Sequence, residues 1–309
     1  MASNMDYRKH LMVMPGSKVD LSSIDPGFKA PHDSKASSQD DLARCVQRLA
    51  ELQYLIYAEN RRSLLICLQG LDAAGKDGTI RHVLGAMNPQ GARVHAFKVP
   101  STLEASHDFL WRAHQHAPAR GEVVVFNRSH YEDVLVARVH GLVPKDVWSK
   151  RYDRINDFEK NLAQGGTHIL KFFLHISDEE QLRRFKQRLV DPKRQWKISE
   201  ADYIERKLWP EYVKAYDEAL SRTSTDNAPW FVIPADRKWF RNLAIGTILV
   251  QTLESLRMKT PVPTADIDDI RRRYHVARRD QRKVASGRSR RTIRSPVETQ
   301  HHEDDHTGD

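Results

Sequence analysis

Cysteine is scarce in this sequence, because only Cys45 and Cys67 occur among its 309 residues. Two cysteines cannot build the disulfide framework of a small secreted protein, so that class of protein is excluded. Cys67 lies within a run of apolar residues, where a small buried thiol is the ordinary interpretation. This cysteine usage fits a reducing compartment, and we expect a cytoplasmic protein.

Two further patterns are missing from the sequence. It has no uninterrupted apolar run of the roughly 20 residues that cross a bilayer, and residues 1–20 lack the apolar core of a signal peptide. The 15 histidines form no HExxH motif and no paired Cys/His spacing, and His301, His302 and His306 lie near the C-terminus. We therefore expect neither a membrane partner nor a transition-metal site.

Positive charge, in contrast, is abundant. The formal net charge is +9 and the isoelectric point is near 9.5. Residues 258–309 contain 12 basic and 9 acidic residues, so they supply +3 and residues 1–257 supply the other +6. This excess predicts a polyanionic partner, which is a nucleic acid, a nucleotide, an acidic membrane surface or an inorganic polyanion.

A phosphate-loop motif occupies residues 63–84, SLLICLQGLDAAGKDGTIRHVL. The apolar run at 64–68 predicts a strand, and the GxxxxGK spacing after it predicts a turn whose N–H groups surround an anion at the start of a helix. The expected phosphate-binding residues are Gly70, Ala73, Ala74, Gly75, Lys76, Asp77 and Gly78. Asp77 replaces the Ser or Thr that usually binds magnesium, so we expect the metal to be held differently.

Apolar periodicity predicts alternating strands and helices along the chain. The expected strands are residues 64–68, 94–99, 123–126, 168–175 and 230–234. The expected helices are residues 40–60, 103–116, 131–139, 145–162, 211–222 and 238–256, with a further helix after its N-cap Ser177. We expect a P-loop kinase-like three-layer α/β/α sandwich with a mainly parallel five-stranded sheet and a helical lid.

Composition divides the chain into three parts. Residues 1–40 contain several prolines and little periodicity, so we expect an extended N-terminal arm with one short ordered piece. Residues 41–257 form the expected P-loop domain, in which the cation-rich residues 183–207 are expected to be a mobile lid. Residues 258–309 have almost no apolar content and should be disordered in isolation, basic at first and then acidic and rich in histidine.

Polar residues follow several of the predicted strands. These residues are Asp72, Lys76, Asp77, Asn127, Arg128, Glu132, Asp133, Asp236, Arg237 and Lys238. The lid adds Arg183, Arg184, Arg188, Lys193, Arg194 and Lys197. Because the carboxyl ends of parallel strands meet at one edge of a sheet, we expect these side chains to converge. Carboxylates that hold magnesium and cations that neutralise phosphate charge are the groups that phosphoryl transfer requires.

Each of these features also has a purely structural interpretation. Asp is common in turns, so Asp72 alone indicates little more than a turn. Asn127 and Arg128 are an ordinary end for an apolar strand. The lid cations also fit a solvated helix face. The phosphate-loop motif is more specific, because it follows a predicted strand and precedes a predicted helix.

Four longer segments extend the pattern: GLDAAGKDG, SHDFLWRAHQHAPARGEVVVFNRSHYEDVLVARV, LRRFKQRLVDPKRQWK and PWFVIPADRKWFRN. In this order they resemble the family-2 polyphosphate kinases, from about Asp6 to about Leu256. Members of that family transfer the terminal phosphoryl group of inorganic polyphosphate to a nucleoside phosphate, or catalyse the reverse reaction. The resemblance implies polyphosphate and AMP, ADP or ATP as substrates, Mg²⁺ or Mn²⁺ as the cofactor, and a homodimer or homotetramer.

The resemblance also implies roles for single residues in the phosphate loop and after the third strand. It associates Asp72 with magnesium and with activation of the acceptor phosphate, and Lys76 with phosphate binding. Arg128 matches the family's catalytic arginine. Many members have Asp where this chain has Asn127, which leaves Asp72 as the expected metal ligand. The following HYED is similar to the subgroup that accepts nucleoside monophosphates as well as diphosphates, with Glu132 recognising the monophosphate.

In the lid, the resemblance identifies Arg188 as the best match to a mobile catalytic arginine. Lys193 and Lys197 are the expected phosphate-binding lysines of this segment. Polyphosphate has neither base nor sugar, so a positively charged groove is sufficient to bind it, and binding should weaken with salt.

We therefore expect reversible, Mg²⁺-dependent, in-line phosphoryl transfer from polyphosphate to AMP or ADP, without a covalent intermediate. Two alternatives stay open. An ATP-dependent nucleotide kinase would share the fold, because a fold does not determine the donor. A non-catalytic nucleic-acid binder would use the basic lid and tail, but RRRYHVARRDQRK offers few aromatic residues for base stacking, so no nucleic-acid partner is expected.

Overall fold

The central strand of the sheet is β1 (Ser63–Gln69), all of whose residues are buried. A computed structural model, which describes residues 5–29 and 31–276, places it in the strand order β2-β3-β1-β4-β5, and every neighbouring pair is parallel. The other strands are β2 (Ala92–Ala96), β3 (Val123–Asn127), β4 (Thr167–His175) and β5 (Trp230–Pro234). The predicted five-stranded parallel sheet is confirmed.

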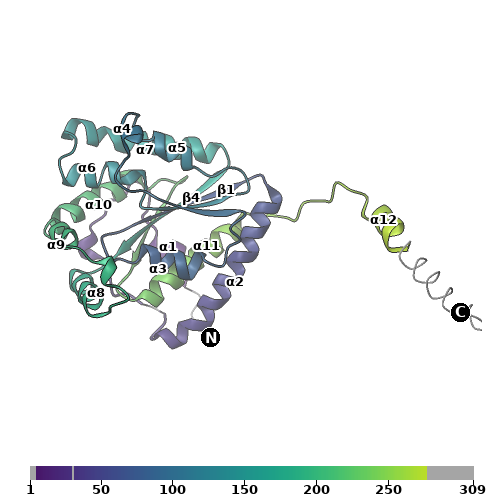
Figure 1. Cartoon of the computed structure of the whole chain (residues 1–309), viewed down its shortest axis with the longest axis horizontal. Coiled ribbons are helices and arrows are strands. Elements are labelled where there is room, and N and C mark those ends of the chain that lie inside the picture. The colour runs from purple at the N-terminus through teal and green to yellow at the C-terminus, as the bar shows by residue number, and fades with distance from the viewer. Residues whose placement is uncertain (1–4, 30, 277–309) are drawn as a thin grey trace, which may run out of the picture. The chain divides into compact units, whose positions relative to one another are not determined.

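Helices cover both faces of the sheet, which explains why β1 is apolar on both sides. Leu64, Ile66 and Leu68 pack in one cluster with residues of α2 (Lys35–Glu59) and α11 (Lys238–Ser255), two helices that lie side by side (Figure 1). Leu65 and Cys67 pack in the other cluster, with residues of α7 (Lys145–Gln164) and α10 (Trp209–Thr223). The three-layer α/β/α architecture is therefore confirmed.

The second strand, predicted at 94–99, is β2 at Ala92–Ala96, and several helices also differ from the predictions. The helix predicted at 103–116 is two helices, α4 (Thr102–Ala105) and α5 (Trp111–His116). The helix predicted at 131–139 is a 3₁₀ turn, η3 (His130–Asp133), followed by α6 (Val136–Val139). After the phosphate loop, α3 (Lys76–Thr79) continues as a π-helical turn, η2 (Ile80–Leu84). Apolar spacing did not reveal these interruptions, because side chains on successive short helices still face one core.

The N-terminal segment is more ordered than the extended arm predicted for residues 1–40. Residues 7–11 form α1 (Tyr7–Leu11), residues 21–23 form the 3₁₀ turn η1 (Leu21–Ser23), and α2 begins at Lys35 after its N-cap Ser34. The backbone N–H of Val13 donates to the Trp230 carbonyl at 2.9 Å, so the segment runs beside the edge strand β5. Its apolar anchors are too few to give a periodic signal.

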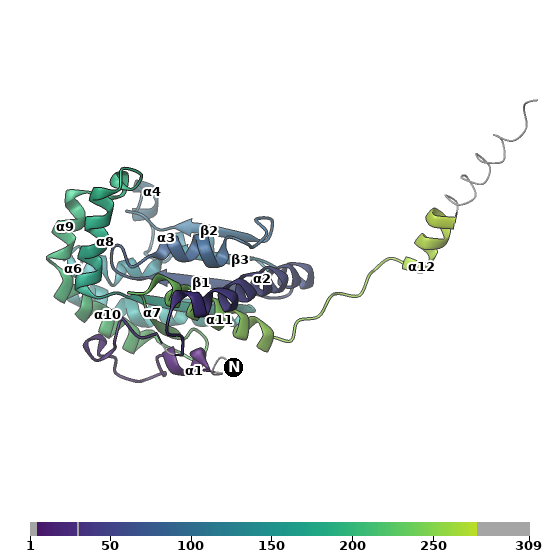
Figure 2. The same ribbon diagram turned by 90° about the horizontal axis from the view of Figure 1, so that it is seen from below.

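The lid follows β4 and consists of α8 (Asp178–Val190), the 3₁₀ turn η4 (Gln195–Lys197) and α9 (Glu200–Arg206). Figures 1 and 2 show α8 and α9 side by side. Ser177 caps α8, as the sequence predicts. However, Arg184 and Phe185 are buried, so the first part of residues 183–207 is packed into the protein rather than forming an exposed lid. On the same helix Arg183 and Lys186 are exposed, and from Leu189 to Trp196 most residues are exposed.

Contacts divide the chain into two units, Met1–Thr260 and Pro261–Asp309, and the first carries the whole sheet. In the second unit, α12 (Ile267–Ile270) and the π-helical turn η5 (Arg271–Val276) are helical, whereas the sequence predicts disorder from residue 258. The basic and acidic, His-rich part of the predicted tail beyond residue 276 lies outside the described residues. Among the described residues, no helix combines the length and the apolar character needed to cross a membrane.

Candidate active site

The phosphate loop joins β1 to α3 and relies on left-handed backbone conformations. Gly70, Ala73 and Gly75 have φ angles of 154°, 60° and 109°. A side chain at Gly70 would also collide with β4, since a Cβ there would lie 2.9 Å from the Leu174 carbonyl oxygen. The two glycines of the GxxxxGK spacing therefore meet real backbone requirements, as predicted.

Side-chain donors hold the carbonyl groups of this loop. Nζ of Lys76 donates to the Gly70 carbonyl at 2.6 Å, and Gln181 of α8 donates to the Asp72 carbonyl at 2.9 Å. Arg184, also on α8, donates to the carbonyls of Ala73 and Ala74 at 2.8 and 3.0 Å. With its carbonyls occupied in this way, the loop can direct N–H groups toward an anion.

Lys76 is partly buried at the start of α3. Burial and the nearby Arg128 lower the pKa of its ammonium group to about 8, although Asp72 opposes both effects. A lysine in such a position gains from a bound phosphate, whose negative charge favours the protonated form. This is the behaviour expected of a phosphate-binding lysine.

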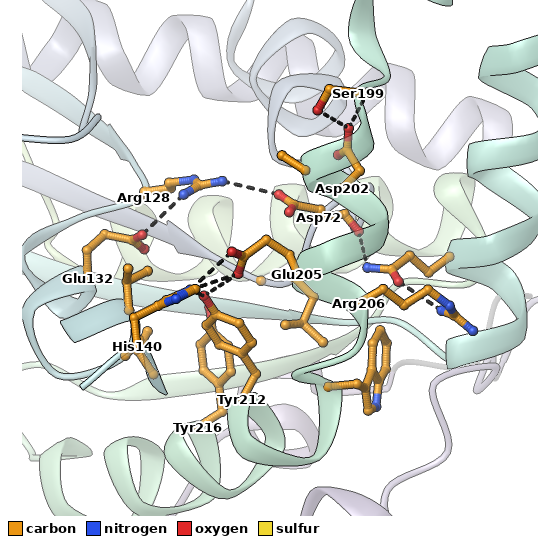
Figure 3. A pocket seen from close by; sticks show the side chains of 17 residues that line it. Asp72, Arg128, Glu132, His140, Ser199, Asp202, Glu205, Arg206, Tyr212 and Tyr216 are labelled. Carbon is orange, nitrogen blue, oxygen red and sulfur yellow. Dashed lines mark hydrogen bonds and ion pairs between the residues drawn. The ribbon is translucent and has the colours of Figure 1, made fainter. Parts of the chain in front are cut away.

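Arg128 links the end of β3 to the phosphate loop. Its Nη2 lies 3.1 Å from Oδ1 of Asp72, and its Nη1 lies 3.2 Å from Oε2 of Glu132 (Figure 3). The backbone of Arg128 is left-handed, with φ of 59°, and its N–H donates to the Leu68 carbonyl at 3.0 Å. A non-glycine residue in this conformation is characteristic of a site under functional constraint.

Asp77 makes contacts on the other side of the loop. Nδ2 of Asn127 donates to Oδ1 of Asp77 at 3.0 Å, and Nζ of Lys197 lies 3.7 Å from Oδ2. The residue that replaces the usual magnesium-binding hydroxyl therefore connects the loop to β3 and to the lid. The structure also brings Lys197 to the site, as the sequence predicts.

The two remaining lid residues do not approach the loop in this arrangement. Arg188 donates to the Lys197 carbonyl at 3.0 Å, lies 3.8 Å from Asp202, and stacks against Phe185. Lys193 is exposed, and its backbone N–H donates to Asp191 at 3.0 Å. The catalytic role of Arg188 and the phosphate-binding role of Lys193 stay predictions.

A cavity of about 340 Å³ opens beside Asp72, Arg128 and Glu132 (Figure 3). Its other walls come from the lid and from α6 and α10. Glu205 of α9 is joined to the body of the protein there, because its carboxylate lies 3.1 Å from His140 and accepts from the Tyr212 hydroxyl at 2.8 Å. The mixture of aromatic, apolar and charged groups suits a ligand with both a ring and phosphates.

Comparisons with known proteins agree with this geometry. The family model described as Polyphosphate kinase 2 (PPK2) matches residues 32–261. The chain belongs to this family. The resemblance stated from the four sequence segments is therefore confirmed, and neither an unrelated nucleotide kinase nor a nucleic-acid binder is favoured.

Individual relatives cover most of the chain. An AMP/ADP-polyphosphate phosphotransferase of Meiothermus ruber is 49% identical over 256 residues, which are 82% of this chain and 96% of that protein. An ADP-polyphosphate phosphotransferase of Rhodopseudomonas palustris is 44% identical over 268 residues, covering 83% and 93%. The crystal structure of Polyphosphate Kinase 2 from Arthrobacter aurescens TC1 superposes with a TM-score of 0.84 at 43% identity, covering 86% of this chain and 95% of that one. The P-loop kinase-like fold is thereby confirmed.

Sequence reasoning missed a buried polar network beneath the site. Nζ of Lys171 donates to Glu159, to the Tyr131 hydroxyl and to the Thr223 carbonyl, at 2.6, 2.8 and 2.6 Å. Burial alone would raise the pKa of Glu159, but Lys171 and His130 more than offset it, so the pKa is lowered. Because Tyr131 belongs to η3, the network fixes the turn that carries Glu132. The signal available in the sequence was a lysine within the otherwise apolar segment HILKFFLH.

The acidic groups near the loop provide some, but not all, of the ligands that a magnesium ion needs. Within residues 5–29 and 31–276, no three His, Cys, Asp or Glu side chains are grouped as a metal site. Asp72 nevertheless offers a carboxylate at the loop, and Mg²⁺ is commonly bound by one or two carboxylates together with substrate phosphates. The residues present therefore fit a magnesium ion that arrives with the substrate.

Proposed function

We propose that this protein transfers the terminal phosphoryl group of inorganic polyphosphate to AMP or ADP, in a reversible reaction. The observation that carries the proposal is the 49% identity, over 82% of the chain, to an AMP/ADP-polyphosphate phosphotransferase. The phosphate loop and the Asp72–Arg128–Glu132 cluster supply groups suited to that reaction. Glu132, which distinguishes the HYED segment, supports AMP as well as ADP as the acceptor.

In the proposed mechanism, the loop N–H groups and Lys76 bind phosphate oxygens at the start of α3. Arg128 leaves its two carboxylate partners in part to neutralise charge on the transferring group, and Asp72 would hold Mg²⁺ together with the substrate phosphates. The bound ion would reduce the repulsion between the two anionic substrates. The residues position the substrates for in-line attack, so the protein itself needs no covalent intermediate.

The lid completes the proposed site. Lys197, already near Asp77, adds positive charge along a polyphosphate chain, and Lys193 and Arg188 would join it if the lid rearranged around the substrate. We further propose a cytoplasmic homodimer or homotetramer without a nucleic-acid partner. Sedimentation analysis of the purified protein, with and without polyphosphate, measures the oligomeric state.

The deciding experiment varies the donor. The purified protein is incubated with Mg²⁺ or Mn²⁺ and with AMP or ADP, and either polyphosphate or ATP is the sole donor. Polyphosphate should yield ADP from AMP and ATP from ADP, and EDTA should stop both reactions. If ATP phosphorylates AMP while polyphosphate does not, the protein is an ATP-dependent nucleotide kinase and the proposal is wrong.

A further inference from the structure

A second buried arginine, Arg241, lies behind the phosphate loop. It is on the first turn of α11 and is 2% exposed. Its Nη1 donates to the Ala74 carbonyl at 3.1 Å, and its Nε and Nη2 donate to Oδ1 of Asn242 at 3.1 and 2.8 Å. All of these acceptors are neutral. The guanidinium is therefore buried without a carboxylate among its hydrogen-bond partners.

The glycines of the loop make room for this guanidinium. A Cβ built on Gly75 would lie 1.8 Å from Nη1 of Arg241, and one on Gly78 would lie 3.0 Å from Nη2. Gly75 of the loop and Gly78 of α3 thus leave space for a side chain that comes from a helix more than 160 residues away in sequence. Arg241 therefore packs directly against the loop backbone at Ala74 and Gly75.

The charge of Arg241 is not balanced locally. Among the described residues, no Asp or Glu forms an ion pair with it, whereas the neighbouring Arg184 lies against Glu180 at 2.6 Å. Burial, together with the positive charge of Arg184, lowers the pKa of Arg241 to about 9. The guanidinium is still protonated at neutral pH. A buried cation of this kind is unfavourable unless an anion compensates it.

We propose that Arg241 is a positioning residue for phosphate binding, which holds the Ala74 carbonyl outward and places behind the loop a positive charge that the substrate phosphate neutralises. The inference rests on the proposed function, because it needs a loop that binds phosphate, and it assigns to the site a residue that does not touch the substrate. Low-dielectric surroundings make such a charge effective across the loop backbone.

Two substitutions separate charge from packing. R241Q removes the charge and keeps an amide donor for Ala74, which Arg184 also serves. R241K keeps the positive charge but replaces the planar guanidinium with a single ammonium group. R62Q is the matched control, since Arg62 precedes β1 at the opposite end of the strand and lies against Glu59. Calorimetry at constant salt gives the Kd of tripolyphosphate and of ADP, and thermal unfolding is followed with and without each ligand.

The Kd should rise at least about tenfold in R241Q, change less than about threefold in R241K, and be unchanged in R62Q. The unfolding temperature of ligand-free R241Q should be no lower than that of the unmodified protein, because an unbalanced buried charge has been removed. Added ligand should raise the unfolding temperature of R241Q by less than it raises that of the unmodified protein. A purely structural residue would give the opposite result, with a less stable free protein.

Wild-type affinity in R241Q overturns the inference, and so does a loss in R241K as large as that in R241Q. Failure of R241Q to fold, with R241K folded but weakly binding, also assigns Arg241 to packing and overturns it. If the unmodified protein binds neither ligand, the proposed function fails together with the inference. If the unmodified protein binds both ligands and the variants behave in any of these contradicting ways, only the role of Arg241 is wrong and the proposed function stands.

Discussion

Nη2 of Arg128 lies 3.1 Å from Oδ1 of Asp72, which connects the end of β3 to the phosphate loop after β1. The same guanidinium lies 3.2 Å from Glu132. Both ion pairs are partly exposed to solvent, so each contributes less than about 1 kcal/mol to stability. Substrate phosphates can therefore compete for Arg128 without unfolding the protein. The cluster is better suited to binding anions than to stabilising the fold.

Removal of the Asp72 charge should stop turnover without unfolding the protein. In Asp72→Asn the proposed magnesium ligand is weakened and Arg128 loses one partner, so we expect kcat to fall at least about 100-fold. Lys76→Ala should lose as much, since it removes the loop cation. Steady-state kinetics and thermal unfolding test both variants, with Asp153→Asn on the surface as the control. Retained activity in either variant removes that residue from the mechanism.

Glu132→Ala should reduce the use of AMP more than that of ADP. Glu132 lines the cavity beside Arg128, where a short acceptor has fewer phosphate contacts to compensate for its loss. We expect kcat/KM for AMP to fall about tenfold further than kcat/KM for ADP. The measurement is product formation from each acceptor at saturating polyphosphate. Glu122→Ala, just before β3, is the control, and equal losses on AMP and ADP would contradict the role of Glu132 in selecting the monophosphate.

Activity should decline as pH rises through about 8. Lys76 is protonated below this pKa and neutral above it, so phosphate binding by the free enzyme weakens on the alkaline side. The contribution of Lys76 to folding stability changes in the opposite direction. Because the pKa of Lys76 is lowered from 10.5 in the folded state, the unfolded chain binds more protons between about pH 8 and 10.5, and this residue adds stability as pH rises there.

A pH profile of kcat/KM, measured beside thermal unfolding at each pH, separates these two effects. Lys76→Arg should move the alkaline limb to higher pH, since arginine keeps its proton. A limb that stays near pH 8 in this variant would assign the titration to another group.

The sheet and the phosphate loop were predictable because local sequence determines them. The short apolar run before Gly70, bounded by a Gly-rich turn, predicts a strand buried on both faces, and the GxxxxGK spacing fixes the turn that follows. Strand ends in a parallel sheet share one edge, so Asp72 and Arg128 could be expected to meet. The break at Ser106 and the 3₁₀ turn at His130 were not predictable, because tertiary packing rather than apolar spacing decides them.

The support behind the loop was also hidden from sequence reasoning. Arg184 was assigned to the mobile lid because it lies in a cation-rich segment, yet it is buried and donates to the carbonyls of Ala73 and Ala74. Arg241 lies in α11, a helix whose sequence pattern predicts a mainly apolar, buried element. Whether a cation faces solvent or a backbone carbonyl depends on which helix face meets the loop, and one sequence does not contain that information.

Deletion of residues 261–309 should leave a folded, active protein. The unit Met1–Thr260 contains the sheet, the phosphate loop and every described residue that lines the cavity. We expect kcat to change less than about twofold, and the unfolding temperature less than about 3 °C. Turnover with long polyphosphate and with tripolyphosphate should be compared in the truncated and full-length proteins. A large loss with both donors would show that the C-terminal segment takes part in the reaction.

Lys171→Met should destabilise the fold strongly, because it leaves the Glu159 carboxylate buried without its cation. The Lys171 and Glu159 side chains are 0% and 1% exposed, and their charged atoms lie 2.6 Å apart. Breaking such a pair from one side costs about 3–5 kcal/mol, whereas replacing both members with apolar residues is often nearly neutral. The double variant Lys171→Met, Glu159→Leu should therefore recover much of the loss in urea unfolding.

Because Tyr131 would still lose two partners in the double variant, its η3 turn should loosen, and AMP use should stay impaired even where stability returns. A double variant that is as unstable as Lys171→Met would show that the two charges do not act as a pair.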